Sequence, residues 1–313
     1  MLTKMNHIKR IVCCGLFGMV FQAQAEVLVI LPDSGPMARA GDSIKLGIEA
    51  AHAASRTDIP LKFINSDQND IATLLNDHIN SETQMVIGPL SRVDVDHLIT
   101  ANPTVPVLAL NEIQRKHDNV WQFSLSKDQD ASALMYVLQK DQIERIFVIR
   151  EKGTEPESLT FVNALFKQFP DEVTIVDDVP KLNPKDGLLL LGSNEWIHTF
   201  KKLPNKQIYV QAISIDQEKQ LPHGVRFCDV NALYQHQWKE IEQLSKAHPT
   251  TLAFQRLYAF GADAWQIAEQ FVMQPDVKNL KFNGRTGHIV ISDNEITRTP
   301  QCFEQKRKKV EAI

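Results

Sequence analysis

The feature that most constrains this fold is a regular alternation of short apolar runs with segments of helical periodicity. In the first half of the chain the apolar runs lie at residues 27–31, 61–64, 84–87 and 105–110, and the helical patterns between them at 44–51, 71–79 and 93–99. This order is typical of a parallel sheet whose crossover helices cover both faces. We therefore expect an α/β fold, with Asp42 or Ser43 as the N-cap of the first helix.

A second set of the same kind follows the first. Its apolar runs lie at residues 145–150, 173–176, 187–191, 207–211 and 225–230, and its helical patterns at 131–138, 159–169 and 194–202. The stretch from Leu188 to Leu191 is apolar throughout, as expected for a strand buried on both faces. The chain is therefore predicted to form two Rossmann-like lobes, with a first crossing between them near residues 121–126.

The order changes near the C-terminus. A long helical pattern at residues 252–271 leads into a turn-rich stretch at 282–287. Two strand-like pieces, 288–292 and 295–298, then flank Asp293-Asn294 and predict a hairpin. We expect lobe I to comprise residues 26–123 with about 240–280, and lobe II to comprise 124–239 with about 281–313. No long Gly/Ser linker separates them, which predicts lobes that pack as one unit.

Residues 1–25 have the pattern of a secretory signal peptide. Lys4, Lys9 and Arg10 precede an apolar stretch at 11–21, and Ala23-Gln24-Ala25 has the small-x-small pattern of a cleavage site. The apolar stretch is shorter than the roughly 20 residues of a membrane-spanning helix. Cys13 and Cys14 follow too early in the apolar region for a typical lipidation signal. We expect cleavage after Ala25, a periplasmic protein, and no transmembrane segment in the mature chain.

The net charge limits the kinds of partner, and two cysteines allow one disulfide in the mature chain. The formal net charge is −4 and becomes about −7 when the three cations of the signal peptide are removed, which argues against nucleic acid as a partner. The short basic run at residues 306–309 is typical of a solvated chain end; the alternative is contact with an anionic envelope surface. Cys228 and Cys302 remain in the mature chain, and export makes a disulfide between them chemically feasible. The alternative is two separately buried thiols.

The sequence contains no common catalytic motif and no complete metal-binding pattern. It has no Gly-x-Ser-x-Gly elbow, no His-Glu-x-x-His and no Gly-rich phosphate loop ending in Lys-Ser/Thr. Asp94 and His97 share a helix face, but two ligands make a poor metal site. We expect no enzyme activity, no cofactor and no metal.

Polar and small residues follow three of the predicted strands. Ser34 and Gly35 come after the first strand, Gly88 and Ser91 after the third, and Asn111 after the fourth. Ligands of open α/β sheets bind beyond the carboxyl ends of the strands, where helix N–H groups can hold a carboxylate. These residues are candidates for a cleft that binds a small molecule; the alternative is that they form tight turns and ordinary helix caps.

A second candidate anion site lies late in the chain. Arg285 stands between Gly284 and Gly287, where backbone N–H groups can form a nest for an anion. The alternatives are a plain turn into the hairpin, or an Arg285 side chain that faces a protein partner.

Several sequence blocks resemble a known family. They lie at residues 27–41, 86–91, 105–111 and 123–131, followed by Arg-Leu-Tyr-Ala-Phe-Gly-Ala-Asp-Ala-Trp at 256–265 and Phe-Asn-Gly-Arg-Thr-Gly at 282–287. The first blocks resemble type I periplasmic binding proteins in general. The last two resemble the LppC/LpoA-like penicillin-binding protein activators, and the match is to the C-terminal, binding-protein-like part of the long family members.

The resemblance implies a fold and a function. It implies periplasmic binding protein type I architecture and a non-catalytic periplasmic protein that regulates peptidoglycan synthesis by protein–protein contact. The implied partner is a class A penicillin-binding protein. The alternative is a solute-binding receptor for an amino acid or a similar small anion.

Overall fold

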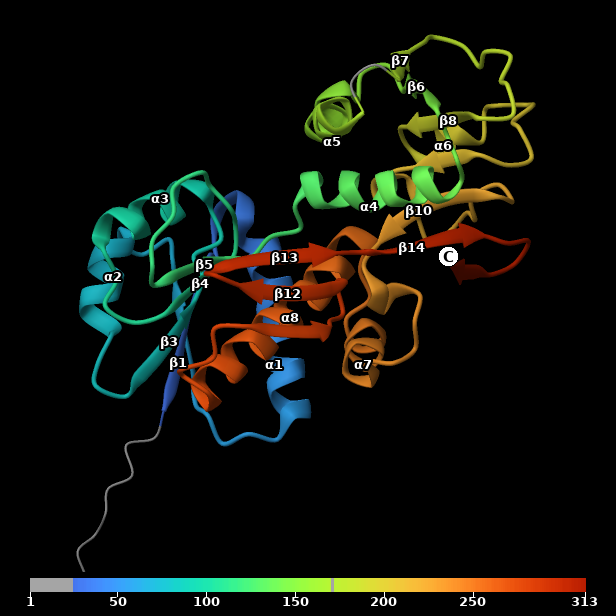
Figure 1. Cartoon of the computed structure of the whole chain (residues 1–313). Helices are drawn as coiled ribbons and strands as arrows, with labels where there is room; N and C mark the ends of the chain where they lie inside the picture. Colours follow the sequence, from blue (N-terminus) through green and yellow to red (C-terminus); the bar gives the residue numbers. More distant parts are fainter. Residues whose placement is uncertain (1–24, 170–171) are drawn as a thin grey trace, which may run out of the picture.

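The chain forms two α/β lobes joined by a small antiparallel sheet (Figure 1). The structure, a computed structural model, describes residues 25–169 and 172–313 of the 313-residue chain. Apart from Ala25, the predicted signal peptide lies outside the described residues. The predicted fold class, α/β with two lobes, is confirmed.

Lobe I is built on a five-stranded, all-parallel sheet in the order β2-β1-β3-β4-β5. Its strands are β1 (Glu26–Leu31), β2 (Leu61–Asn65), β3 (Thr83–Ile87), β4 (Val107–Ala109) and β5 (Val120–Gln122). Its helices are α1 (Ala38–Ser55), α2 (Ile71–His78), α3 (Arg92–Ala101), α7 (Lys239–Ala247) and α8 (Leu252–Met273).

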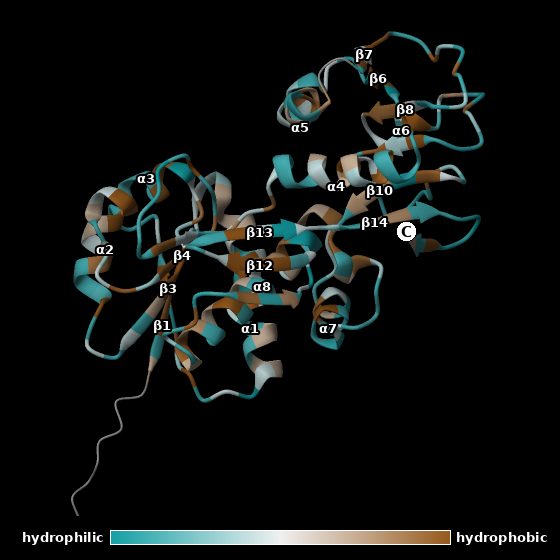
Figure 2. Ribbon diagram, viewed as in Figure 1, coloured by the Kyte–Doolittle hydropathy of each residue, from teal (hydrophilic) through white to brown (hydrophobic). Residues whose placement is uncertain are grey.

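Alternation along β1 shows why this sheet needs helices on both faces. Val27 and Val29 are buried in a cluster with α1 and α8, whereas Leu28 and Ile30 are buried in a second cluster with α2 and α3. Successive strand residues point to opposite faces, so an apolar run without polar interruptions must be covered twice. Figure 2 shows this concentration of hydrophobic residues along the strands.

Lobe II is built on a seven-stranded mixed sheet in the order β15-β14-β10-β9-β8-β6-β7. The strands from β10 to β7 pair in parallel, and β14 and β15 add an antiparallel edge. They comprise β6 (Arg145–Arg150), β7 (Val173–Ile175), β8 (Asp186–Leu191), β9 (Ile208–Val210), β10 (Val225–Asp229), β14 (Gln301–Gln305) and β15 (Val310–Ala312). The helices of this lobe are α4 (Lys127–Lys140), α5 (Glu155–Gln168) and α6 (Asn194–Ile197). Short 3₁₀ turns are η1 (Gly35–Met37), which precedes α1 in lobe I, and η2 (Ala212–Ser214) and η3 (Asn231–Leu233), which lie on either side of β10.

The third sheet consists of β11 (Leu280–Asn283), β12 (His288–Ser292) and β13 (Glu295–Thr299). The predicted hairpin is β12–β13, and the turn residues Asp293 and Asn294 both have positive φ, 49° and 67°, as a two-residue hairpin turn requires. Ile289, Ile291 and Ile296 are buried in the same cluster as α1 and α8.

This packing bears on how the chain is divided between the lobes. The division into 26–123 with about 240–280 and 124–239 with about 281–313 stays a prediction. Because β11–β13 pack on α8 while β14 and β15 extend the second sheet, we propose to count 280–299 with lobe I and 301–313 with lobe II.

Cys228 and Cys302 are joined by a disulfide in the structure. They are direct partners in the antiparallel pairing of β10 with β14. The bond therefore ties the C-terminal edge strand to the parallel part of the lobe II sheet.

Some element boundaries differ from those expected. The first helix begins at Ala38 rather than near Asp42, because Pro36 opens a 3₁₀ turn that runs directly into it. Ser43 is therefore inside the helix, where its hydroxyl donates to the Arg39 carbonyl at 2.9 Å. Helix α7, with only Ile241 and Leu244 buried, and the short strands β5, β11, β14 and β15 were not expected from the sequence. The helix expected at 194–202 ends at Ile197.

Candidate functional site

The candidate residues at the end of β1 contact the end of β2 rather than an open cleft. The backbone N–H and the hydroxyl of Ser34 both donate to the Asp67 carboxylate, at 3.0 and 2.8 Å. Asp33 and Asn65 also hydrogen-bond to each other. Gly35 has φ +64° and open space around the position of a Cβ. The hydrogen-bonding groups of Ser34 thus already have partners within the chain.

Gly88 is a packing position. It has φ +104°, and an added Cβ would lie 2.1 Å from the carbonyl oxygen of Ile30 on the adjacent strand β1. Only glycine accommodates both the left-handed backbone and this close approach. The backbone N–H of Gly88 donates to the Leu108 carbonyl at 2.8 Å, which extends the pairing of the sheet.

Ser91 and Asn111 are brought together in one network. Ser91 caps α3: its hydroxyl accepts from the backbone N–H of Asp94 at 3.0 Å and donates to the Asp94 carboxylate at 2.6 Å. The Asn111 amide donates to the Leu90 carbonyl at 3.0 Å, and its oxygen accepts from Nε of Arg92 at 3.2 Å. Both residues therefore contribute hydrogen bonds to the β3–α3 turn.

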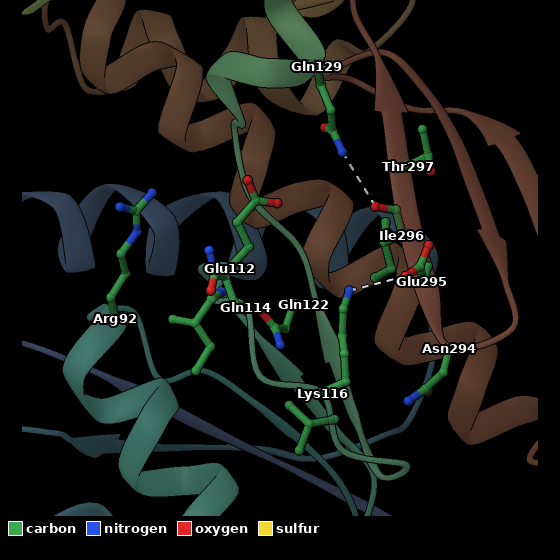
Figure 3. Close-up of a pocket in the computed structure, with 12 residues that line it drawn as sticks. Arg92, Glu112, Gln114, Lys116, Gln122, Gln129, Asn294, Glu295, Ile296 and Thr297 are labelled. Carbon is green, nitrogen blue, oxygen red and sulfur yellow. Dashed lines mark hydrogen bonds and ion pairs between the residues drawn. The ribbon is translucent and has the colours of Figure 1, made fainter. Parts of the chain in front are cut away.

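A pocket of about 570 Å³ lies beside this network, between lobe I, the start of α4 and the hairpin (Figure 3). Nζ of Lys116 lies 3.3 Å from Oε1 of Glu295 across it, and the Gln129 amide donates to the Ile296 carbonyl at 3.5 Å. Two side-chain oxygens at the pocket, Oε1 of Gln129 and Oδ1 of Asn294, are buried without a hydrogen-bond partner among the described residues. These acceptors make the pocket the best-supported place for a small ligand that carries N–H or O–H groups.

The two lobes are linked beyond this pocket by buried charges. Arg256 of α8 donates to both carboxylate oxygens of Asp229 at the end of β10, and to the Ala212 carbonyl at 2.8 Å. Tyr234 donates to the same carboxylate at 2.7 Å. Burial, together with the charge of Asp229, raises the pKa of the Tyr234 hydroxyl well above its ordinary value. Tyr234 is thus a half-buried, neutral donor to this carboxylate.

The glycine-flanked turn around Arg285 does bind an anion, but the anion is a carboxylate of the chain itself. The backbone N–H groups of Arg285 and Thr286 and the Thr286 hydroxyl all donate to Asp263, at 2.7–2.8 Å. The Arg285 guanidinium pairs with Glu240 of α7 at 2.7 Å and is itself largely buried. Burial raises the pKa of Asp263, and the Arg285 charge opposes that rise. Arg285 therefore does not face a partner.

A second buried arginine links the hairpin to lobe II. Arg298 of β13 is 2 % exposed and donates to Asp130 of α4 at 2.5 Å and to the Thr286 carbonyl at 3.1 Å. The strict alternation along β13 places Arg298 on its buried face. This contact and the Arg256–Asp229 pair cross between the lobes at two separate places.

The ion pairs of Arg256, Arg285 and Arg298 were not predicted from the sequence. The signal was present, because Arg256 and Asp263 lie in one of the two blocks that most resemble the family, and Arg285 in the other. Among the described residues, no group of three or more His, Cys, Asp or Glu side chains is placed to hold a metal ion. Within the same part of the chain, no helix is both long and apolar enough to cross a bilayer.

Comparison with known proteins gives one family match. The family model described as "LppC putative lipoprotein" matches residues 13–153 and 199–306. The penicillin-binding protein activator LpoA of Haemophilus ducreyi is 24 % identical over 299 residues, which cover 86 % of this chain and 51 % of the relative. The chain thus spans about half the length of the curated relatives it matches.

Solved structures agree on the fold. The C-domain of LpoA from Haemophilus influenzae, described as a regulator of PBP1A, superposes with a TM-score of 0.73 at 17 % identity and covers 92 % of this chain and 100 % of that domain. A leucine binding protein from Thermotoga maritima has a TM-score of 0.55 at 16 % identity, covering 92 % and 97 % of the two chains. The predicted periplasmic binding protein type I architecture is confirmed.

Proposed function

Because this chain belongs to the LppC family, we propose that it is a non-catalytic periplasmic regulator of peptidoglycan synthesis. It acts by binding a class A penicillin-binding protein and shifting that synthase towards its active state. The observation that carries the proposal is the match to penicillin-binding protein activators along 86 % of the chain.

The geometry of the lobe junction supports a contact scaffold over a closing receptor. The Arg256–Asp229 and Arg298–Asp130 pairs join the lobes, and breaking either leaves a buried charge without its partner. At the strand ends, Ser34, Ser91 and Asn111 bind groups of their own chain. A protein held in one lobe arrangement suits recognition of a macromolecule by its outer surface.

The test is reconstitution with a purified class A penicillin-binding protein. We expect this protein to bind the synthase and to raise its rate of glycan polymerisation or peptide cross-linking severalfold. The matched control is the protein from Thermotoga maritima that shares the fold and is described as a leucine binding protein. Absence of both binding and stimulation, or equal stimulation by the control, would refute the proposal.

A second candidate function, a receptor for an amino acid or similar small anion, rests on the pocket beside α3. There the unpartnered oxygens of Gln129 and Asn294 could receive an ammonium group, and Arg92 lines the same pocket. A ligand at a hundred times its Kd would stabilise the protein by about 2.7 kcal/mol, which a thermal-shift screen of amino acids and peptidoglycan fragments detects. A shift that is lost in Gln129→Met and kept in the exposed control Gln68→Met would support this candidate; no shift from any compound would remove it.

A further inference from the structure

Lobe II carries a band of cations along the edge farthest from lobe I. Three connections form this basic edge: residues 198–207 between α6 and β9, 215–224 between η2 and β10, and the β14–β15 turn at 306–309. In Figure 1 they line one side of the molecule, opposite the end occupied by lobe I. The cations of the basic edge are Lys201, Lys202, Lys206, Lys219, Lys306, Arg307, Lys308 and Lys309.

Hydrogen bonds and packing hold the three connections side by side. The backbone N–H of Gly224 donates to the Gln305 carbonyl at 2.8 Å, and the Gln220 amide donates to the Lys308 carbonyl at 3.4 Å. A Cβ on Gly224 would lie 2.7 Å from the Asn205 carbonyl oxygen, so the first two connections also touch. One apolar cluster contains Leu203 of the first connection, Leu221 of the second, and Val310, which follows the β14–β15 turn. The cations therefore form one surface although they are separated in the sequence.

The same three connections also carry two acidic residues, Asp216 and Glu218, so the basic edge has eight cations against two acids. Lys306 pairs with Glu304, and Lys309 with Glu311 at 2.5 Å. Within the described ranges, the other six cations form no ion pair, and all six are exposed. The chain as a whole carries a net charge of −4, so this edge is opposite in sign to the rest of the protein.

We propose that the basic edge binds the anionic surface of a phospholipid bilayer. Seven of its eight cations are lysines, whose point charges on flexible stems suit mobile phosphate headgroups. Two carboxylates of this chain, Asp229 and Glu240, each accept two N–H groups from one arginine, and among the described residues of the basic edge no arginine is arranged in this way. The acidic remainder of the protein is repelled by the same surface, so the contact is edge-on and orients lobe I away from the bilayer.

Vesicle co-sedimentation of the purified protein tests the proposal without any synthase present. We expect binding to vesicles of phosphatidylglycerol and phosphatidylcholine, none to phosphatidylcholine alone, and weakening as salt shortens the screening length. In the variant Lys206→Glu/Lys219→Glu/Lys308→Glu, which changes one exposed lysine in each connection, affinity should fall at least about 100-fold, since each cation is worth about fivefold.

A matched variant separates the edge from overall charge. Lys246→Glu/Lys278→Glu/Lys281→Glu alters three exposed lysines outside the basic edge and changes the net charge by the same amount. It should bind vesicles within a few-fold of the wild type. Equal loss in both variants, no binding of wild type to anionic vesicles, or binding to purified peptidoglycan in place of vesicles would each overturn the proposal. Far-ultraviolet circular dichroism checks that both variants are folded, and the salt dependence of the wild type tests the proposal independently of either.

Discussion

Arg256 and Asp229 form a buried, two-pronged ion pair that joins lobe I to lobe II. The Nε–Oδ1 distance is 2.7 Å and the Nη2–Oδ2 distance is 2.8 Å, and the Asp229 side chain is 1 % exposed. Residue 256 lies on α8, which packs on the lobe I sheet, while residue 229 ends the lobe II strand β10. Any opening of the lobes that separates α8 from β10 must break this pair.

Removing the arginine should therefore be costly. We expect Arg256→Ala to lower the free energy of unfolding by about 3–5 kcal/mol, because it leaves the Asp229 carboxylate buried with Tyr234 as its remaining side-chain donor. Urea unfolding followed by circular dichroism measures the change. The control is Arg39→Ala, an exposed arginine of α1 that stacks on Phe254 and should cost about 1 kcal/mol or less. Equal losses in the two variants would contradict the assigned role of Arg256.

The Cys228–Cys302 disulfide should contribute through the unfolded state. It closes a loop with a sequence separation of 74 residues, which corresponds to about 4 kcal/mol of chain entropy in the loop-closure model. We expect reductant to lower the free energy of unfolding of the wild type by up to that amount. The Cys228→Ser/Cys302→Ser variant should be less stable and insensitive to reductant. A wild type that unfolds identically with and without reductant would show that the bond contributes no stability.

Two glycines among the candidate residues should respond differently to alanine. At Gly88 the new Cβ meets the Ile30 carbonyl and the backbone has φ +104°, so Gly88→Ala should lose several kcal/mol or fail to fold. At Gly35 the backbone is left-handed but the space is open, so Gly35→Ala should cost about 1–2 kcal/mol. Thermal unfolding of both variants checks this order. A larger loss of stability in Gly35→Ala than in Gly88→Ala would contradict the open space around Gly35.

The order of the elements was predictable from the sequence because the inner parallel strands, such as β1, β4 and β8, are buried on both faces. Runs such as residues 27–31 and 188–191 are apolar without interruption, as expected for strands covered on both faces. Elements whose burial depends on distant partners were missed. Strand β14 contains Gln301, Glu304 and Gln305, and it is a strand because it pairs with β10 and because Glu304 meets Arg226.

The candidate site was predictable only in part, for the same reason. The strand-end residues were identified from local pattern, yet whether a hydroxyl at such a position is free depends on long-range contacts such as Ser34 with Asp67. The alternation along β13 indicates that Arg298 is buried, but its partner Asp130 lies 168 residues away. Charge pairs of this kind require the fold before they can be recognised.

An acidic residue of lobe II gives the stability a defined pH dependence. Hydrogen bonds from Arg145 lower the pKa of the Asp186 carboxyl below its ordinary value of 3.8, and a backbone N–H at Asn183 adds to this. Because the folded-state pKa is the lower one, the stabilisation is complete above pH 3.8 and is lost as the pH falls through the depressed value.

Asp186→Asn removes that titration. The difference in unfolding free energy between wild type and Asp186→Asn should be constant from about pH 7 to about pH 5 and should shrink steadily below about pH 4. Urea unfolding at a series of pH values measures it. Arg145→Gln removes the main cause of the lowered pKa, so this variant should lose the same part of the acid dependence while keeping the carboxylate. A difference between wild type and Asp186→Asn that stays constant down to pH 3 would show that the Arg145–Asp186 pair does not lower the pKa of this carboxyl.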